Sequence, residues 1–449
     1  MAIKKNAILI TAAVLLITMS FAVAACAADV SVSDEENLRD MLTAGNSVTL
    51  TADIQLTNGN ITLSTGTPAH NLNGFSLTAA QNQRVFDIRN DAAFTLTDTS
   101  GGGKVAGNGI VSENGAGIYI HSGGVFIMNS GCISGFQTEK DGGGVGIADG
   151  TFTMNGGTIT GCSAAGWSGG GGVYVGCSTD EEGYVLNYGV FTMNGGTITN
   201  CEATDDFGSG GGICAENTFT MNSGTITNCR ATGMLGNGGG IAIKSGPFTM
   251  TNAMITDCVS KSNGGGVSIS FGDFTMTKST ITGCSAGDGA GVSYSGWSSF
   301  AINDGIIKDN TAESGTGIYS ISPVNVSGIT ELSNVELLKL GDEYYIIIAE
   351  NGFSGSVQNI KLSSAETREE NPSEWLGQTI VKNGASVKNS FTLSTSSLYD
   401  GYELAVNGAD LVLAEKTKQT EKSPASPAPF AGLLAGLGTA AVFFGLRRK

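Results

Sequence analysis

The feature that most constrains this chain is an internal repeat in its middle part. An eleven-residue unit recurs as FTMNGGTITGC, FTMNGGTITNC, FTMNSGTITNC, FTMTNAMITDC and FTMTKSTITGC, at 152–162, 191–201, 219–229, 248–258 and 274–284. A second marker, Gly followed by Val or Ile, recurs from Gly117 to Gly317 in steps of 25 to 28 residues, with one step of 40. Constant units joined by variable loops indicate a solenoid, in which each unit buries its apolar face against its neighbours.

Within one unit, apolar residues alternate with polar ones. Phe152 and Met154 fall on one side of an extended strand, with Thr153 on the other. Ile159 and the segment Val173–Val175 repeat this alternation further along the unit. The segments are too short and too β-branched for helices, so each unit contains three short strands separated by Gly- and Asn-rich turns. We therefore predict an all-β chain in which residues 47–322 form a parallel β-helix with three short strands per coil.

Glycine explains how so many turns fit into one chain. The 449 residues include 68 glycines, which is roughly 15% and about twice the usual share, but only 7 prolines. The apolar content of 40% is enough for a core. The runs of three glycines are interpreted as turns and not as phosphate-binding loops, because no helix carrying Lys-Ser or Lys-Thr follows them. The step of 40 residues comes from an insertion, Gly176–Gly189.

Stacked coils place equivalent residues above one another, so the repeat predicts columns of like side chains. Two inward columns are expected, one of phenylalanine and one of methionine. Their members are Phe152, Phe191, Phe219, Phe248 and Phe274, and Met154, Met193, Met221, Met250 and Met276. A column of asparagines at the following turn is expected to satisfy backbone groups of that turn. Its members are Asn129, Asn155, Asn194, Asn222 and Asn303.

A further column consists of five cysteines, which are Cys162, Cys201, Cys229, Cys258 and Cys284. They stack and do not converge, so they do not suit a metal ion, and we predict neither a metal nor a cofactor. Neighbours about 5 Å apart could form disulfides, but the odd number favours buried free thiols that act as small hydrophobes. Both alternatives remain open, and Cys177 with Cys214 is a further candidate pair.

The N-terminus predicts export. Residues 1–27 are interpreted as a signal peptide, with Lys4 and Lys5 ahead of an apolar run and small residues behind it. The sequence that ends in Cys26 also resembles a lipoprotein box, so lipidation of Cys26 is an alternative to simple cleavage.

The C-terminus predicts an anchor. A polar linker at 415–429 leads to a hydrophobic segment at 430–449, which ends in Arg447, Arg448 and Lys449. Its apolar run is just long enough to cross a bilayer core. Because the basic end suits the cytoplasmic side, we expect a cell-surface protein that contacts the membrane through this segment and whose body faces outward.

Both ends of the coil need a cover. Residues 28–46 are predicted to form a capping helix that starts with the capping box Ser33–Glu36. Its apolar face, Leu38, Met41 and Leu42, would close the first coil and protect the edge strands. Residues 323–414 alternate more loosely, which leaves irregular final coils and a small β-domain as alternatives.

The repeat resembles those of adhesin-like surface proteins of methanogenic archaea and some Firmicutes, within the pectin-lyase-like superfamily. The resemblance rests on FTMNGGTIT followed by GGGVYV, and on SVTLTADIQL at 47–56, AHNLNGFSL at 69–77 and AFTLTDTSGGG at 93–103. It implies a right-handed coil preceded by a short helix. The linker, short hydrophobic span and basic end similarly resemble the sorting signals that archaeosortases and exosortases process. Because this fold hosts many activities, the resemblance does not define a function.

Charge and composition exclude some kinds of function. The net charge is −17, with only 23 Lys and Arg residues, so nucleic-acid binding is not expected. His70 and His121 are the only two histidines, which leaves almost no material for a histidine-based centre. The acidic clusters Asp180–Glu182 and Asp205–Asp206 have no basic column beside them. We interpret them as solvated loop charge and predict no catalytic residue.

Apolar residues in the loops after the cysteine column are not explained by the core. Trp167, Phe207, Met234 and Leu235 lie five or six residues beyond their cysteines on three successive coils. They form either a structural stack over the rod or an exposed patch that contacts an extracellular glycan or a surface protein. The leading hypothesis is therefore an adhesin-like or envelope structural protein that binds through its loops. A lyase or hydrolase of acidic polysaccharides is the alternative.

Overall fold

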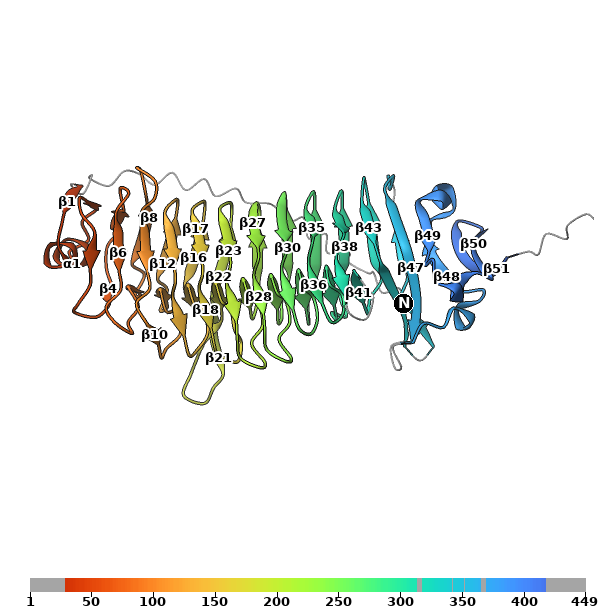
Figure 1. The fold of residues 1–449 in the computed structure, drawn as a ribbon, viewed down its shortest axis with the longest axis horizontal. Coiled ribbons are helices and arrows are strands. Elements are labelled where there is room, and N and C mark those ends of the chain that lie inside the picture. The colour runs from red at the N-terminus through yellow and green to blue at the C-terminus, as the bar shows by residue number, and fades with distance from the viewer. Residues whose placement is uncertain (1–28, 313–316, 341, 351, 365–368, 417–449) are drawn as a thin grey trace, which may run out of the picture.

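The computed structural model describes residues 29–312, 317–340, 342–350, 352–364 and 369–416. Over these ranges the chain winds into a right-handed parallel β-helix of about 12 turns, shaped as a rod (Figure 1). A helix, α1 (Glu35–Thr43), lies at one end of the rod. An antiparallel hairpin of β50 (Tyr402–Asn407) and β51 (Asp410–Glu415) lies at the other. The predicted fold class is confirmed.

One coil shows how the repeat unit folds. Its strands are β16 (Thr151–Met154), β17 (Thr158–Thr160), β18 (Ser163–Ala164) and β19 (Val173–Val175). The sequence predicted three of them. The fourth, β18, belongs to an eight-stranded sheet whose strands are two residues long and pair in parallel. A two-residue strand is too short to show an alternating pattern, so the sequence could not reveal it.

The phenylalanine and methionine columns lie inside the rod, as predicted. Phe152 pairs in register with Phe191, and Met154 with Met193. The phenylalanine pairing continues coil by coil to Phe300. Between Phe152 and Phe274, the centroids of neighbouring phenylalanine rings are 4.7 to 5.3 Å apart. Truncating a buried phenylalanine to alanine typically costs about 3–5 kcal/mol, so this column contributes strongly to the stability of the fold.

The glycine that ends each Gly-rich run before Val145, Val173, Ile213, Ile241 and Val267 packs against the cysteine column. A Cβ atom on Gly240 would lie 2.6 Å from the carbonyl oxygen of Gly266 and 3.3 Å from the Sγ atom of Cys258. Similar contacts recur at Gly144 and Gly172. The glycine therefore makes room both for the backbone of the next coil and for a thiol, which links two features that are far apart in the repeat unit.

The asparagine column forms a ladder, but its hydrogen bonds are not those predicted. Asn155 Nδ2 donates to Asn129 Oδ1, Asn194 Nδ2 to Asn155 Oδ1, and Asn222 Nδ2 to Asn194 Oδ1, each over 2.9 Å. The amides bond to one another along the stack, so the prediction that they bond to the turn backbone was wrong. Coils in register bring equal amides to the spacing of neighbouring strands, which is short enough for this direct bond.

The capping helix forms, but its first turn differs from the prediction. Asp34 is the N-cap residue, and its carboxylate accepts a hydrogen bond from the Asn37 N–H over 3.0 Å. The predicted capping box that begins at Ser33 was therefore wrong, because the charged carboxylate one residue later caps the helix more strongly. Leu38 and Leu42 are buried against the first coil, and Met41 packs at its margin.

A strand precedes the capping helix. β1 (Val30–Val32) pairs in parallel with β2 (Val48–Leu50), so the first coil starts before α1 and not after it. Glu35 then ties the helix to this end of the rod by accepting hydrogen bonds from the backbone N–H groups of Thr57 and Asn58. The helix is thus an insertion into the first coil.

Beyond the regular repeats the coils continue in a looser form. β42 (Val324–Ser327), β46 (Ile347–Ala349) and β48 (Thr379–Lys382) extend the sheet that carries the phenylalanine column. The hairpin β50–β51 then joins β48 in antiparallel fashion and ends that sheet. A closing hairpin reduces the length of free edge that could pair with another chain.

No helix in the described ranges has the length and apolarity that crossing a bilayer requires. The predicted signal peptide at 1–27 and hydrophobic segment at 430–449 lie outside these ranges, as does nearly all of the linker at 415–429.

Candidate ligand-binding surface

The four candidate residues lie in loops at 165–172, 204–212 and 232–240, on three successive coils. Each loop connects a two-residue strand to the next inward-facing strand of the same coil. All four side chains are at the surface: Trp167 is 68% exposed, Phe207 42%, Met234 72% and Leu235 50%. We call these four residues the strip.

Trp167 and Phe207 stack face to face. Their ring centroids are 4.6 Å apart and their planes differ by 7°. On the next coil the Leu235 N–H donates to the carbonyl oxygen of Asp206 over 2.8 Å, which places Leu235 beside Phe207. The sequence offered a stack and an exposed patch as alternatives, whereas the structure combines them in a stack that lies at the surface.

A partly buried carboxylate holds the first loop of the strip. Asp141 Oδ1 accepts hydrogen bonds from the backbone N–H groups of Ser168 and Gly169, over 2.9 and 2.7 Å. Burial raises the pKa of Asp141, although these two hydrogen bonds oppose the effect. Because both donors directly follow Trp167, Asp141 fixes the backbone that presents the indole ring.

In each of the two acidic clusters, Asp180–Glu182 and Asp205–Asp206, an aspartate bonds to loop backbone. Asp205 Oδ1 accepts from the Phe207 N–H over 3.0 Å. Asp180 Oδ1 accepts from the Tyr184 N–H over 2.7 Å. These bonds are typical of turn-forming aspartates, whose carboxylates satisfy nearby backbone donors. They support the interpretation of both clusters as parts of loops.

The insertion forms a feature that the sequence did not predict. β20 (Cys177–Thr179) and β21 (Val185–Tyr188) form an antiparallel hairpin that projects from the lower edge of the rod in Figure 1. All four residues of β21 are exposed, and Tyr184, Leu186 and Tyr188 are large apolar side chains among the exposed residues there. The insertion therefore adds a second exposed apolar segment to this part of the molecule.

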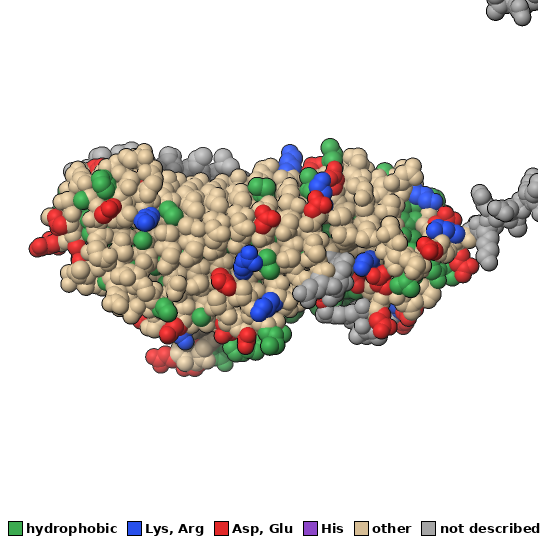
Figure 2. Space-filling view, in the orientation of Figure 1, with side chains coloured by type: hydrophobic (Ala, Val, Ile, Leu, Met, Phe, Trp, Pro, Cys, Tyr) green, Lys and Arg blue, Asp and Glu red, His purple; other side chains and the backbone are tan. Residues whose placement is uncertain are grey.

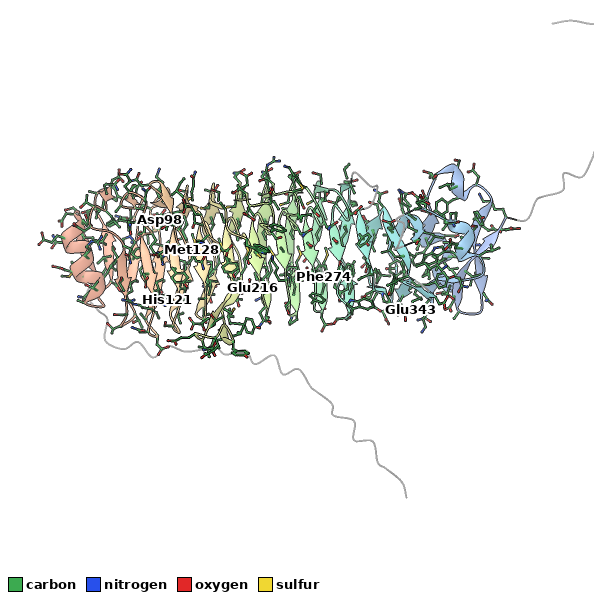
Figure 3. The ribbon with its side chains drawn as sticks, turned by 90° about the horizontal axis from the view of Figure 1, so that it is seen from below. Asp98, His121, Met128, Glu216, Phe274 and Glu343 are labelled. Carbon is green, nitrogen blue, oxygen red and sulfur yellow. The ribbon has the colours of Figure 1, made fainter. Side chains whose placement is uncertain are left out.

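Glu216 connects the hairpin to the strip. Its Oε1 accepts from Ser168 Oγ over 3.0 Å, and its Oε2 accepts from Cys177 Sγ over 3.8 Å. Glu216 is labelled in Figure 3, in the middle part of the rod. In Figure 2 hydrophobic side chains gather along the lower edge, where the hairpin projects in Figure 1. Strip and hairpin together thus form one candidate binding surface.

The cysteine column contributes to packing. All five members, from Cys162 to Cys284, are free and buried. Burial raises the pKa of Cys258. Cys177 and Cys214 are free as well, and burial raises the pKa of Cys214 to about 12. The buried, unbridged thiols of the column pack as small apolar groups.

The two histidines occupy opposite environments. His70 is fully buried beside the rings of Phe86 and Phe94, and burial lowers its pKa to about 3. His121 lies at the outer surface, where its ring nitrogens bond to Asp87 and Ser122. The scarcity of histidines gave no reason to predict a role for His121, and only the register between coils reveals its partners.

No known protein family, curated protein or solved structure matches this chain. Among the described residues, no group of three or more His, Cys, Asp or Glu side chains is arranged to hold a metal ion. Fold and surface together define a parallel β-helix protein with an exposed aromatic stack on one edge.

Proposed function

We propose that this protein is a cell-surface, adhesin-like β-helix that binds an extracellular glycan or a surface protein through the strip. The observation that carries the proposal is the exposed stack of Trp167 on Phe207. The resemblance of the repeat to adhesin-like proteins of the pectin-lyase-like superfamily supports it. The predicted signal peptide and hydrophobic C-terminal segment support display on the cell surface, with the rod facing outward.

The physical chemistry of the strip suits a sugar or an apolar protein patch. Aromatic rings held at a surface offer large, rigid contact areas at low conformational cost. The loop backbone around Trp167 is already ordered by Asp141, so binding would require little further ordering. A net charge of −17 opposes the approach of polyanions. We therefore expect a neutral glycan or a neutral to basic protein surface as the ligand.

The experiment compares the double variant Trp167→Ser/Phe207→Ser with the control Trp297→Ser. Trp297 is also an exposed tryptophan, at 66%, but it lies outside the strip. Binding of the purified protein to a glycan panel and to whole cells is measured, with analysis for cleaved products. We expect the double variant to lose at least about tenfold in affinity, since aromatic anchors commonly contribute 2 kcal/mol or more, while the control keeps full binding.

Thermal unfolding separates binding from folding. The double variant should unfold within a few degrees of the parent protein, because both side chains lie outside the core. A large loss of stability would show that the strip serves the rod, and equal binding by parent and double variant would remove the strip as the binding surface. Cleaved glycan products would instead favour the polysaccharide lyase or hydrolase.

A further inference from the structure

A second cluster of polar groups lies on the outer surface, about two coils before the strip. β7 (Phe86–Ile88) and β11 (Ile118–Ile120) are neighbours in one parallel sheet, with Asp87 opposite Tyr119. His121 follows β11 directly and is labelled in Figure 3. Its Nε2 lies 3.1 Å from Asp87 Oδ1, and its Nδ1 lies 3.0 Å from Ser122 Oγ.

The direction of these hydrogen bonds follows from the chemistry of the partners. An ionised carboxylate only accepts, so His121 Nε2–H donates to Asp87. Nδ1 of the neutral ring then carries a lone pair and accepts from the Ser122 hydroxyl. The three groups therefore form a relay in which a carboxylate orients an imidazole, and the imidazole accepts the proton of a surface hydroxyl.

Neighbouring cations keep Asp87 ionised. Arg84 lies 3.7 Å from Asp87 Oδ2, and Arg89 lies 3.8 Å from Asp87 Oδ1. Burial opposes ionisation, but the hydrogen bond to His121 and the charges of Arg84 and Arg89 outweigh it and lower the pKa of Asp87. The His121 ring also stacks on Tyr119, with centroids 4.9 Å apart. The imidazole is thus held on one face and at both nitrogens.

The backbone at Ser122 is an independent sign that this residue has a special role. Its φ of 50° is in the left-handed region, and the following Gly123 has a φ of 77°. Most other non-glycine residues with positive φ in the described ranges are Asn or Asp, which tolerate this conformation best. Ser122 is the one serine among them. Such strain, of about 1 kcal/mol or more, often accompanies functional sites.

We propose that Ser122 is an activated nucleophile that transfers the acyl group of a carboxylic ester. The Ser122 oxygen attacks the ester carbonyl carbon, and the proton of its hydroxyl passes to His121 Nδ1. The C–O bond to the alcohol then breaks, and His121 returns the proton to the leaving alkoxide. A water molecule repeats the sequence, releases the carboxylic acid and restores the Ser122 hydroxyl.

One backbone donor can stabilise the negative oxygen of the intermediate. The Gly123 N–H directly follows the nucleophile and donates to no acceptor in the described part of the chain. An N–H at this position commonly serves as an oxyanion donor.

The test is covalent labelling of the purified full-length protein with an alkyl fluorophosphonate, followed by peptide mapping. The probe reacts by the same attack, with fluoride as the leaving group. We expect an adduct on Ser122 that is absent from Ser122→Ala and unchanged in the control Ser298→Ala, which alters an exposed serine without a histidine partner. His121→Gln should slow labelling about 100-fold or more, the usual effect of losing a general base.

Asp87 acts as a positioning residue, so its variant needs a different readout. Asp87→Asn should lower the maximal labelling rate at an unchanged half-saturating probe concentration, because it disturbs the tautomer and orientation of His121 and not the binding of the probe. If circular dichroism shows that His121→Gln is misfolded, His121→Phe is tested instead, because its ring can still stack on Tyr119. No adduct on Ser122, or equal rates with and without His121, would overturn the proposal. Trp167→Ser/Phe207→Ser should label normally, so the two proposals can fail separately.

Discussion

His70 occupies a position in the core where its neighbours are apolar. It pairs in register with Val48 on one side and Leu96 on the other, in the same column as Met128. Both of its ring nitrogens are buried and have no hydrogen-bond partner. A buried polar group without a partner costs about 1–3 kcal/mol. The histidine is thus a local defect in an otherwise apolar column.

Replacing His70 by leucine should therefore stabilise the protein. His70→Leu removes two unsatisfied nitrogens and keeps the side chain near the size of its neighbour Leu96, so the free energy of unfolding should rise by roughly 1–3 kcal/mol. Denaturant unfolding at pH 7 measures the change. Leu77→Ala, which truncates a buried side chain in the same part of the rod, should have the opposite effect.

The same residue predicts a dependence of stability on pH. The pKa of His70 is about 3 in the folded protein, against an ordinary value of 6.5. Between these values the unfolded chain binds a proton that the folded chain excludes. Titration of His70 therefore leaves the free energy of unfolding unchanged above pH 6.5. As the pH falls from 6.5 towards 3, it lowers the free energy of unfolding by about 1.4 kcal/mol per pH unit. From pH 7 to pH 4.5 the stability difference between His70→Leu and the parent should grow by roughly 2–3 kcal/mol, and a constant difference would contradict the argument.

At the scale of elements, the coil depends on close approach between its turns and its strands. Gly240 lies against the backbone of the next coil and against the thiol of Cys258, as its equivalents do in other coils. These glycines were predicted as turn residues, but Gly240 is needed for a tertiary contact and not for a turn conformation. Its φ is not in the left-handed region.

Gly240→Ala should therefore destabilise the protein through steric contact alone. The new methyl group would lie 2.6 Å from a carbonyl oxygen, and neither backbone can move without disturbing its hydrogen bonds. Overpacking of this kind costs about 1–3 kcal/mol. Gly401→Ala is the matched control, because nothing lies within 4 Å of its Cβ position and its φ is not positive. Equal melting temperatures for the two variants would show that the coil can adjust.

At the scale of the whole molecule, the rod is nearly one-dimensional. Each coil contacts the coils before and after it, and the same columns pass through all of them. In such a structure, stability is close to a sum over coils and their interfaces. The number of coils is therefore not critical for folding, provided that every strand still pairs with the equivalent strand of the neighbouring coil.

Removing one whole coil should leave a folded protein. Deletion of residues 248–273 joins Pro247 to Phe274, so that Phe274 takes the place of Phe248 beside Phe219. Circular dichroism should show an unchanged β spectrum and a cooperative transition at a somewhat lower temperature. Deletion of residues 248–260 removes only part of the coil and places two strands of one sheet in succession. That variant should not fold, and folding of both variants to equal extents would contradict the register described.

Much of the candidate surface could be anticipated because solenoid neighbours are set by the repeat. Trp167, Phe207 and Leu235 lie at similar distances beyond the cysteine column, and the structure places them on successive coils. The exposure of the Trp167 and Phe207 side chains could not be predicted, because it depends on how far each loop projects from the surface of the rod. The projecting hairpin β20–β21 was missed for the same reason, since an insertion has no equivalent in neighbouring coils.

The sequence by itself determined the repeat, the inward columns and the all-β class, because a period-2 alternation repeated at nearly constant steps permits only one stacking. Only the tertiary structure decided which side chains meet where the steps vary or the pattern is short. The meeting of Asp87 with His121 and Ser122 depends on the register of two coils outside the regular repeat. Such lateral contacts are set by backbone hydrogen bonds between coils, and local sequence carries little information about them.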